Sequence, residues 1–271
     1  MPASAPGAIR SGSTASNVID HLHLVLLFAG GVLGGMINVL AGGAGFMTFP
    51  LLLAAGLSEM EANAANFVAL LPANIVGSFV YRREIMTVRD HLVTRLVLAA
   101  AGGVLGSLLF VWLGADFFKR IIPWLLVFAT LSFALGPTIK AWLERHQSFD
   151  VSRWLWLSFV LEFLVYLYGG YFGLGMGILL LAIHSIFSHM TIHQAQALRN
   201  ATICIMTVIS IAIFATTGLI PWFASFVMMA GVLVGGYIMA HLARRMPQEV
   251  VRKGILVWSI IMTAIAFWRY S

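Results

Sequence analysis

Charged side chains are scarce in this sequence. Of its 271 residues only 10% are Asp, Glu, Lys or Arg, whereas 61% are hydrophobic. A water-soluble domain of this size could not cover its surface with so few charges. The composition therefore excludes a soluble fold and predicts an all-α integral membrane protein that spans the lipid bilayer several times.

Cysteine and recognisable enzyme motifs are lacking as well. The single Cys204 lies inside an apolar run, so no disulfide framework exists and the thiol is interpreted as inert packing. There is no Gly-x-Ser-x-Gly elbow, no phosphate-binding loop and no His-Glu-x-x-His, so we predict neither an enzyme nor an ATP-driven pump, and no cofactor. The net charge of +6 does not indicate a nucleic-acid partner, because the basic residues lie in short loops between apolar runs.

The first 18 residues lack the apolar stretch and small-residue cleavage site of a signal peptide. They are rich in Ser, Ala, Gly and Pro, so residues 1–18 are predicted to form a disordered N-terminal tail. Beyond this tail, the apolar runs indicate a first transmembrane repeat at 19–139 and a second at 154–271. A charged linker at 140–153 separates the repeats and is predicted to be cytoplasmic.

Each half contains four long apolar runs and one short run that begins with glycines. A short run of about 15 residues covers roughly 22 Å as a helix, less than the hydrocarbon thickness of about 30 Å. Two such segments at matching places are typical of a transporter site made of broken helices. The long runs lie near 22–40, 62–81, 92–113, 121–139, 154–168, 195–216, 222–242 and 255–268, and the short ones at 43–57 and 173–187.

Three sequence correspondences support an internal repeat. The glycine spacing that opens the first short segment recurs in the second, a polar residue between two alanines follows each, and a Gly-x-x-x-Gly pair occurs once in each half. The last pattern predicts close approach of helix backbones. The matching sets are Gly43 and Gly45 with Gly173, Gly175 and Gly177; Ala62-Asn63-Ala64 with Ala195-Gln196-Ala197; and Gly102-x-x-x-Gly106 with Gly231-x-x-x-Gly235.

The basic loops predict the topology. Loops around Arg83, at 140–153 and around Arg244 are assigned to the cytoplasm, with Arg95 counted in the first of them. An even number of crossings must then separate Arg153 from Arg244, so the short segments have to traverse. The result is ten crossings, five in each half, with two inverted-topology repeats built from eight full helices and two short ones. Both termini are predicted to lie outside.

Arg199 is the strongest single indication of a functional site. Gln196, Arg199 and Asn200 follow the spacing that places three side chains on one helix face. A charge at membrane depth is costly, so its default interpretation is functional. The alternative is that Arg199 lies near the end of its helix and extends to the membrane surface.

Amides and glycines complete the predicted substrate site. Asn63 and Asn66 offer uncharged donors on the matching helix of the first half, although such amides can also bond only to neighbouring helices. Backbone N–H groups at a glycine-led helix start can face an oxyanion, although glycines can also serve close packing alone. The predicted substrate-binding residues are Arg199, Asn200, Gln196, Asn66, Asn63, Gly43, Gly45, Gly173, Gly175 and Gly177.

Titratable residues in the apolar runs are candidates for proton coupling. Glu162 lies in the middle of its span and could carry a proton or serve as a fixed partner of Arg199. His184, in the second short segment, titrates near neutral pH in water, but a satisfied core histidine is the alternative. His189 and His193 have helical spacing for a metal but no carboxylate or cysteine nearby, so no metal site is predicted.

Several motifs resemble those of the TauE/SafE sulfite exporter family of membrane permeases, over about residues 22–268. In the second half these are Gly169-Gly-Tyr-Phe-Gly-Leu-Gly-Met-Gly-Ile-Leu-Leu-Leu-Ala182, Ile192-His-Gln-Ala-Gln-Ala-Leu-Arg-Asn200 and Gly218-Leu-Ile-Pro-Trp. In the first half they are Ala41-Gly-Gly-Ala-Gly, Ala62-Asn-Ala-Ala-Asn66 and Tyr81-Arg-Arg. Phe67 and Gln196 depart from the family pattern, in which a basic residue and an Asn are usual at these positions.

The resemblance implies secondary transport, often export, of sulfite, sulfonates or related small sulfur anions across the bacterial cytoplasmic membrane. We accordingly expect a small anionic substrate, an alternating-access mechanism and coupling to H+ or Na+. A passive anion channel and a scaffold or enzyme subunit that moves nothing are the alternatives. Assembly into a homo-oligomer stays open.

Overall fold

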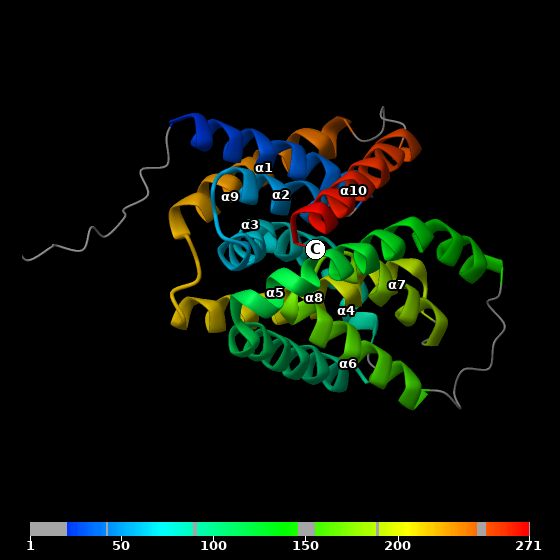
Figure 1. The fold of residues 1–271 in the computed structure, drawn as a ribbon. Helices are drawn as coiled ribbons and strands as arrows, with labels where there is room; N and C mark the ends of the chain where they lie inside the picture. Colours follow the sequence, from blue (N-terminus) through cyan, green and yellow to red (C-terminus); the bar gives the residue numbers. More distant parts are fainter. Residues whose placement is uncertain are drawn as a thin grey trace, which may run out of the picture.

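The computed structural model describes residues 21–41, 43–88, 91–145, 155–187, 190–242 and 248–270, and these are helical throughout apart from short turns and connections. The predicted all-α fold class is confirmed for this part of the chain (Figure 1). The predicted tail at 1–18 and most of the predicted linker at 140–153 lie outside the described residues.

The helices coincide closely with the predicted spans. Only the six-residue helix after Val80 was not expected. The first half contains α1 (His21–Ala41), α2 (Gly45–Ala54), α3 (Glu59–Val80), α4 (Arg82–Thr87) and α5 (Leu92–Arg145), and the second contains α6 (Leu155–Tyr171), α7 (Met176–Phe187), α8 (Ile192–Thr216), α9 (Trp222–Leu242) and α10 (Gln248–Tyr270).

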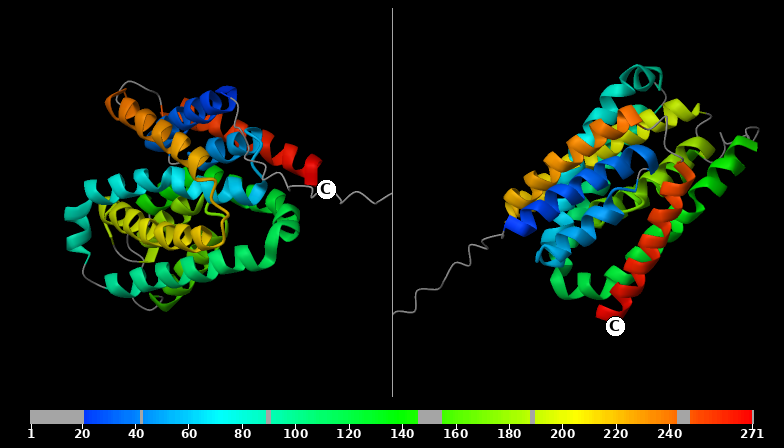
Figure 2. Two further views of the ribbon diagram at one scale, coloured as in Figure 1. Left: turned by 90° about the vertical axis from the view of Figure 1, so that its left-hand side faces the viewer. Right: turned by 90° about the horizontal axis from the view of Figure 1, so that it is seen from above.

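The 54-residue α5 contains both spans predicted at 92–113 and 121–139. Gly114 interrupts it with φ 71° and ψ −176°, a conformation outside the helical region that glycine adopts without steric cost. The ribbon turns back on itself there (Figure 2). The two segments of α5 are therefore two separate helices, in agreement with the two spans that the sequence predicted.

Matching capping boxes begin the long helices that follow α2 and α7. At α3 the Ser58 hydroxyl accepts from the Glu61 amide while the Glu61 carboxylate accepts from the Ser58 amide, and Thr191 and Gln194 do the same for α8. Each box satisfies amides that a helix start leaves without partners. Counting from these caps, position Asn66 in α3 corresponds to Arg199 in α8.

The two Gly-x-x-x-Gly pairs bring helices from opposite halves into backbone contact, as predicted. A methyl group on Gly231 would meet the carbonyl of Phe28 in α1, and one on Gly106 would meet the carbonyl of Leu167 in α6. Along α1, Gly31 faces residues 228–231 and Gly35 faces residues 232–236, so α1 and α9 run parallel (Figure 1). The first segment of α5 runs parallel to α6 in the same way.

Helices α3 and α8 lie in the middle of the bundle and run antiparallel (Figure 1). The ring of Phe67 packs against that of Phe214 with their centroids 5.5 Å apart, whereas Gly77 faces Asn200 farther along. Within the described residues, four helical stretches are long and apolar enough to cross a membrane alone: Glu59–Val80, Leu92–Gly136, His193–Thr216 and Trp222–Met239. Ten crossings and the inversion of the halves remain predictions.

Candidate functional site

The glycine-led starts of α2 and α7 meet inside the protein. A Cβ atom on Gly45 would lie 3.1 Å from the Cγ atom of Leu174 and 3.4 Å from the amide nitrogen of Asn66. Gly173 and Gly175 have φ values of 82° and 79°, which side chains other than glycine rarely adopt. The backbone between α6 and α7 can therefore turn sharply beside α2 and α3.

Asn63 and Asn66 are buried, and each has a partner in the protein. The Asn63 amide donates to the carbonyl of Tyr171 at 3.1 Å, and the hydroxyl of Thr48 donates to the amide oxygen of Asn66 at 2.5 Å. These bonds join α3 to the last residue of α6 and to α2. Structural hydrogen bonding, the alternative considered for both amides, is thus part of their role.

Arg199 lies beside the first turn of α7. Its guanidinium carbon is 3.5 Å from the position of a Cβ atom on Gly177, and its Nε atom is buried with no hydrogen-bond partner in the part of the chain that the structure describes. No described carboxylate lies within ion-pair distance of it. The guanidinium is therefore a positive charge without a counter-charge from these residues.

The position of Gly177 shows which way Arg199 extends. Gly177 lies at the end of α7 opposite to the connection into α8, and 12 residues of helix span about 17 Å. The guanidinium thus extends away from the start of its own helix, which favours a functional role over extension to the membrane surface. Its neighbour Asn200 is buried and packs against Gly77 of α3.

Of the other predicted site residues, Gln196 is half-buried on α8. Its side chain forms no hydrogen bond with another described residue. Gly43 is buried, and a Cβ atom there would lie 2.9 Å from the ring of Phe133. Its role is close packing against the second segment of α5.

Glu162 does not pair with Arg199. Its carboxylate lies 3.3 Å from the guanidinium of Arg95 and 3.6 Å from the imidazole of His184, and it accepts a hydrogen bond from Ser158 at 2.7 Å. All of these side chains are buried. The assignment of Arg95 to a cytoplasmic loop was wrong, because this residue is only 1% exposed and lies one turn inside α5.

Sequence reasoning missed this cluster because its members come from three helices. The available signal was that Arg95 lies inside an apolar run, after Leu92 and Val93, rather than in the loop before it. Among the predicted metal candidates, His193 is exposed and stacks near Tyr81 with ring centroids 6.5 Å apart, whereas His189 lies outside the described residues. No group of three potential metal ligands occurs within the described chain.

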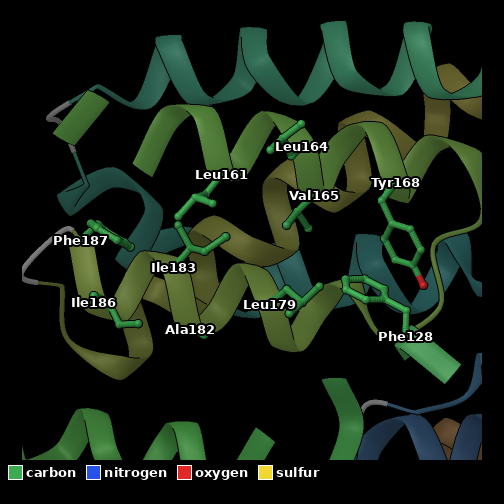
Figure 3. Close-up of a pocket in the computed structure, with 10 residues that line it drawn as sticks. All are labelled: Phe128, Leu161, Leu164, Val165, Tyr168, Leu179, Ala182, Ile183, Ile186 and Phe187. Atoms are coloured by element: carbon green, nitrogen blue, oxygen red, sulfur yellow. The ribbon is translucent and has the colours of Figure 1, made fainter. Parts of the chain in front are cut away.

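A separate apolar pocket of about 380 Å³ opens between the second segment of α5, α6 and α7 (Figure 3). Its walls offer no charged group, and Tyr168 turns its hydroxyl to the carbonyl of Leu174. An anion would lose its hydration there without compensation. The lining residues are Phe128, Leu161, Leu164, Val165, Tyr168, Leu179, Ala182, Ile183, Ile186 and Phe187.

Comparisons with known proteins agree with the motifs. A family model described as "Sulfite exporter TauE/SafE" matches residues 27–266. "Probable membrane transporter protein YfcA" of Escherichia coli (strain K12) is 26% identical over 251 residues, which cover 91% of this chain and 90% of that protein. A "Probable membrane transporter protein" of Haemophilus influenzae is 27% identical over 242 residues, or 89% and 93%. No solved structure gives a significant match.

Proposed function

This chain belongs to the TauE/SafE sulfite exporter family, a family of membrane transporters, and on that premise we propose that it moves a small sulfur oxyanion, such as sulfite or an organosulfonate, through alternating access. The observation that carries the proposal is the guanidinium of Arg199, which has no carboxylate partner among the described residues. Export across the bacterial cytoplasmic membrane is the direction that the family description suggests.

The surroundings of Arg199 suit an anion. A helix start carries partial positive charge and amide groups without intrahelical partners, and Gly177 leaves those amides accessible beside the guanidinium. Hydrogen bonds from a guanidinium to an oxyanion are among the stronger ones in proteins. Because Glu162 is already paired with Arg95 and no described carboxylate reaches Arg199, a bound anionic substrate would supply its counter-charge.

The matching region of the first half supplies a second polar wall, farther along the bundle axis than Arg199, because Phe67 is level with Phe214 whereas Gly77 is level with Asn200. Asn66 faces Gly45 as Arg199 faces Gly177, and Leu174 lies between the two glycine-led helix starts. An amide in place of a guanidinium leaves this wall polar but uncharged, so one oxyanion is enough to neutralise the site. Rocking of the halves about this point would expose the anion to either side in turn.

The test is transport into liposomes that contain the purified protein. We expect radiolabelled sulfite or sulfoacetate to exchange across the membrane with the wild-type protein and not with the Arg199→Ala variant. Arg83→Ala is the matched control, because Arg83 is exposed at the start of α4. Undiminished exchange by Arg199→Ala, with normal folding, would reject the site.

The same liposomes separate a coupled carrier from a passive channel. A carrier shows faster uptake of labelled substrate when unlabelled substrate is present on the far side, because each return step then carries a molecule. A channel gains nothing from substrate on the far side. Absence of such acceleration would favour the channel alternative.

A further inference from the structure

A buried cluster of ionisable side chains lies outside the proposed anion site. Arg95 of α5, Glu162 of α6 and His184 of α7 meet with all three side chains no more than 1% exposed. The carboxylate lies between the two bases, 3.3 Å from the guanidinium and 3.6 Å from the imidazole. Three helices therefore converge on one carboxylate.

The charge balance of this cluster is neutral only when His184 is uncharged. Arg95 and Glu162 form an ion pair, and isolated charges are too costly to keep in such surroundings. Both ring nitrogens of His184 and one oxygen of Glu162 are buried without a hydrogen-bond partner in the described chain. An N–H on Nε2, the nitrogen that faces this oxygen, could donate to it, and Nδ1 is then the atom that can take up a further proton.

The elements packed around His184 bring few other charges. From α5 it is faced by Arg95 and from α6 by Glu162, and Tyr166, one turn after Glu162, is buried as well. From α8 it is faced by the backbone at Ala195, one turn before Arg199. Glu162 is accordingly the group that would stabilise an imidazolium at this position.

Helix α7 connects this cluster with the proposed anion site. Gly177, beside Arg199, and His184, beside Glu162, lie seven residues apart on α7, about 10 Å along the helix axis. A bound anion and a protonated imidazole at this distance attract one another in surroundings that screen charge weakly. Each therefore increases the affinity of the protein for the other.

We propose that His184 binds the proton that crosses the membrane together with the anion, with Glu162 as its counter-charge and Arg95 as the residue that positions Glu162. Movement of α7 relative to α5 and α6 would separate His184 from Glu162 and release the proton on the other side. The proposal rests on the proposed function of the Arg199 site. Because such co-transport is reversible, the sum of the anion and proton gradients sets its direction.

The test uses two assays of the reconstituted full-length protein with radiolabelled sulfoacetate. In one, a pH gradient drives accumulation, and in the other, labelled and unlabelled sulfoacetate exchange without a gradient. For His184→Gln we expect accumulation to fall by about tenfold or more while exchange persists, because exchange needs no net change in protonation. His241→Gln, at an exposed histidine of α9, is the matched control.

A second measurement, on the wild-type protein, tests the proposal even if His184→Gln does not fold. Sulfoacetate added to wild-type protein in an unbuffered detergent solution should raise the pH of the solution, because the protein takes up protons, and the pH should fall back when the anion is removed. Exchange without gradient-driven accumulation by the wild type, or equal accumulation by folded His184→Gln, would overturn the proton site and leave the anion site standing. Absence of sulfite and sulfoacetate exchange by the wild type would overturn both.

Discussion

The guanidinium carbon of Arg199 lies 3.5 Å from the position that a Cβ atom would take on Gly177. The amide nitrogen of Asn66 lies 3.4 Å from the corresponding position on Gly45. Asn66 and Arg199 each follow the capping residue of their helix by eight positions. The same contact, between a polar side chain of a long helix and a glycine in the first turn of the preceding short helix, thus occurs once in each half.

Enlarging Gly177 tests this contact directly. A Cβ atom at 3.5 Å from the guanidinium is ordinary van der Waals contact, so Gly177→Ala should fold and transport. Gly177→Val would displace the guanidinium, and we expect the transport rate to fall by about tenfold or more, because small misplacements of a binding group are costly. Rates of sulfite exchange by the two variants provide the comparison, and equal rates would contradict the proposed position of the anion.

Helix contact through Gly231 should be sensitive to a single methyl group. Gly231→Ala places that group against backbone atoms of α1, which cannot move aside as a flexible side chain could. Overpacking of this kind costs about 1–3 kcal/mol. Gly254→Ala is the matched control, because a Cβ atom there meets nothing within 4 Å. Thermal unfolding in detergent should show a lower midpoint for the first variant alone.

Removal of Arg95 should be more harmful than removal of the whole ion pair. Arg95→Met leaves the carboxylate of Glu162 buried without its main counter-charge, which costs about 3–5 kcal/mol. The double variant Arg95→Met, Glu162→Leu removes both charges and should recover most of this loss. Unfolding midpoints of the single and double variants measure the difference, and additive losses would show that the pair is not coupled.

The side chain of Asn63 forms a hydrogen bond between the two halves, and its removal should lower the stability of the protein. In Asn63→Ala the carbonyl of Tyr171 loses its donor, and an unsatisfied buried group costs about 1–3 kcal/mol. The turn at Gly173 should loosen as a result. A lower unfolding midpoint is expected, measured without substrate so that any change in binding does not contribute; an unchanged midpoint would mean that the bond adds nothing.

The topology can be mapped with single cysteines in a Cys204→Ser background. The Gln194 side chain donates to the hydroxyl of Thr87 at 3.0 Å, so the start of α8 and the end of α4 lie at one end of the bundle. Arg83→Cys and Met190→Cys should therefore react with an impermeant reagent from the cytoplasmic side. Lys119→Cys should react from the opposite side. Labelling of all three cysteines from one side would contradict the predicted ten crossings.

Local signals placed most of the helices. The apolar runs gave their positions, whereas the capping boxes of Ser58 with Glu61 and of Thr191 with Gln194, which the structure shows, place the helix starts three residues before the predicted spans. The break at Gly114 falls in the gap between the spans predicted at 92–113 and 121–139, although the sequence did not single out this glycine. The small helix α4 was missed, because its six residues carry no apolar period.

The sequence by itself determined that this is a multi-pass helical membrane protein with an isolated Arg199 and a recurring glycine pattern, since hydropathy, caps and spacing act within one segment. Only the tertiary structure decided that Glu162 belongs to Arg95 and His184 and that Arg199 faces Gly177. The reason is that a buried charge must find its partner in space, and parallel packing of helices from opposite halves brings together residues that are far apart in the chain.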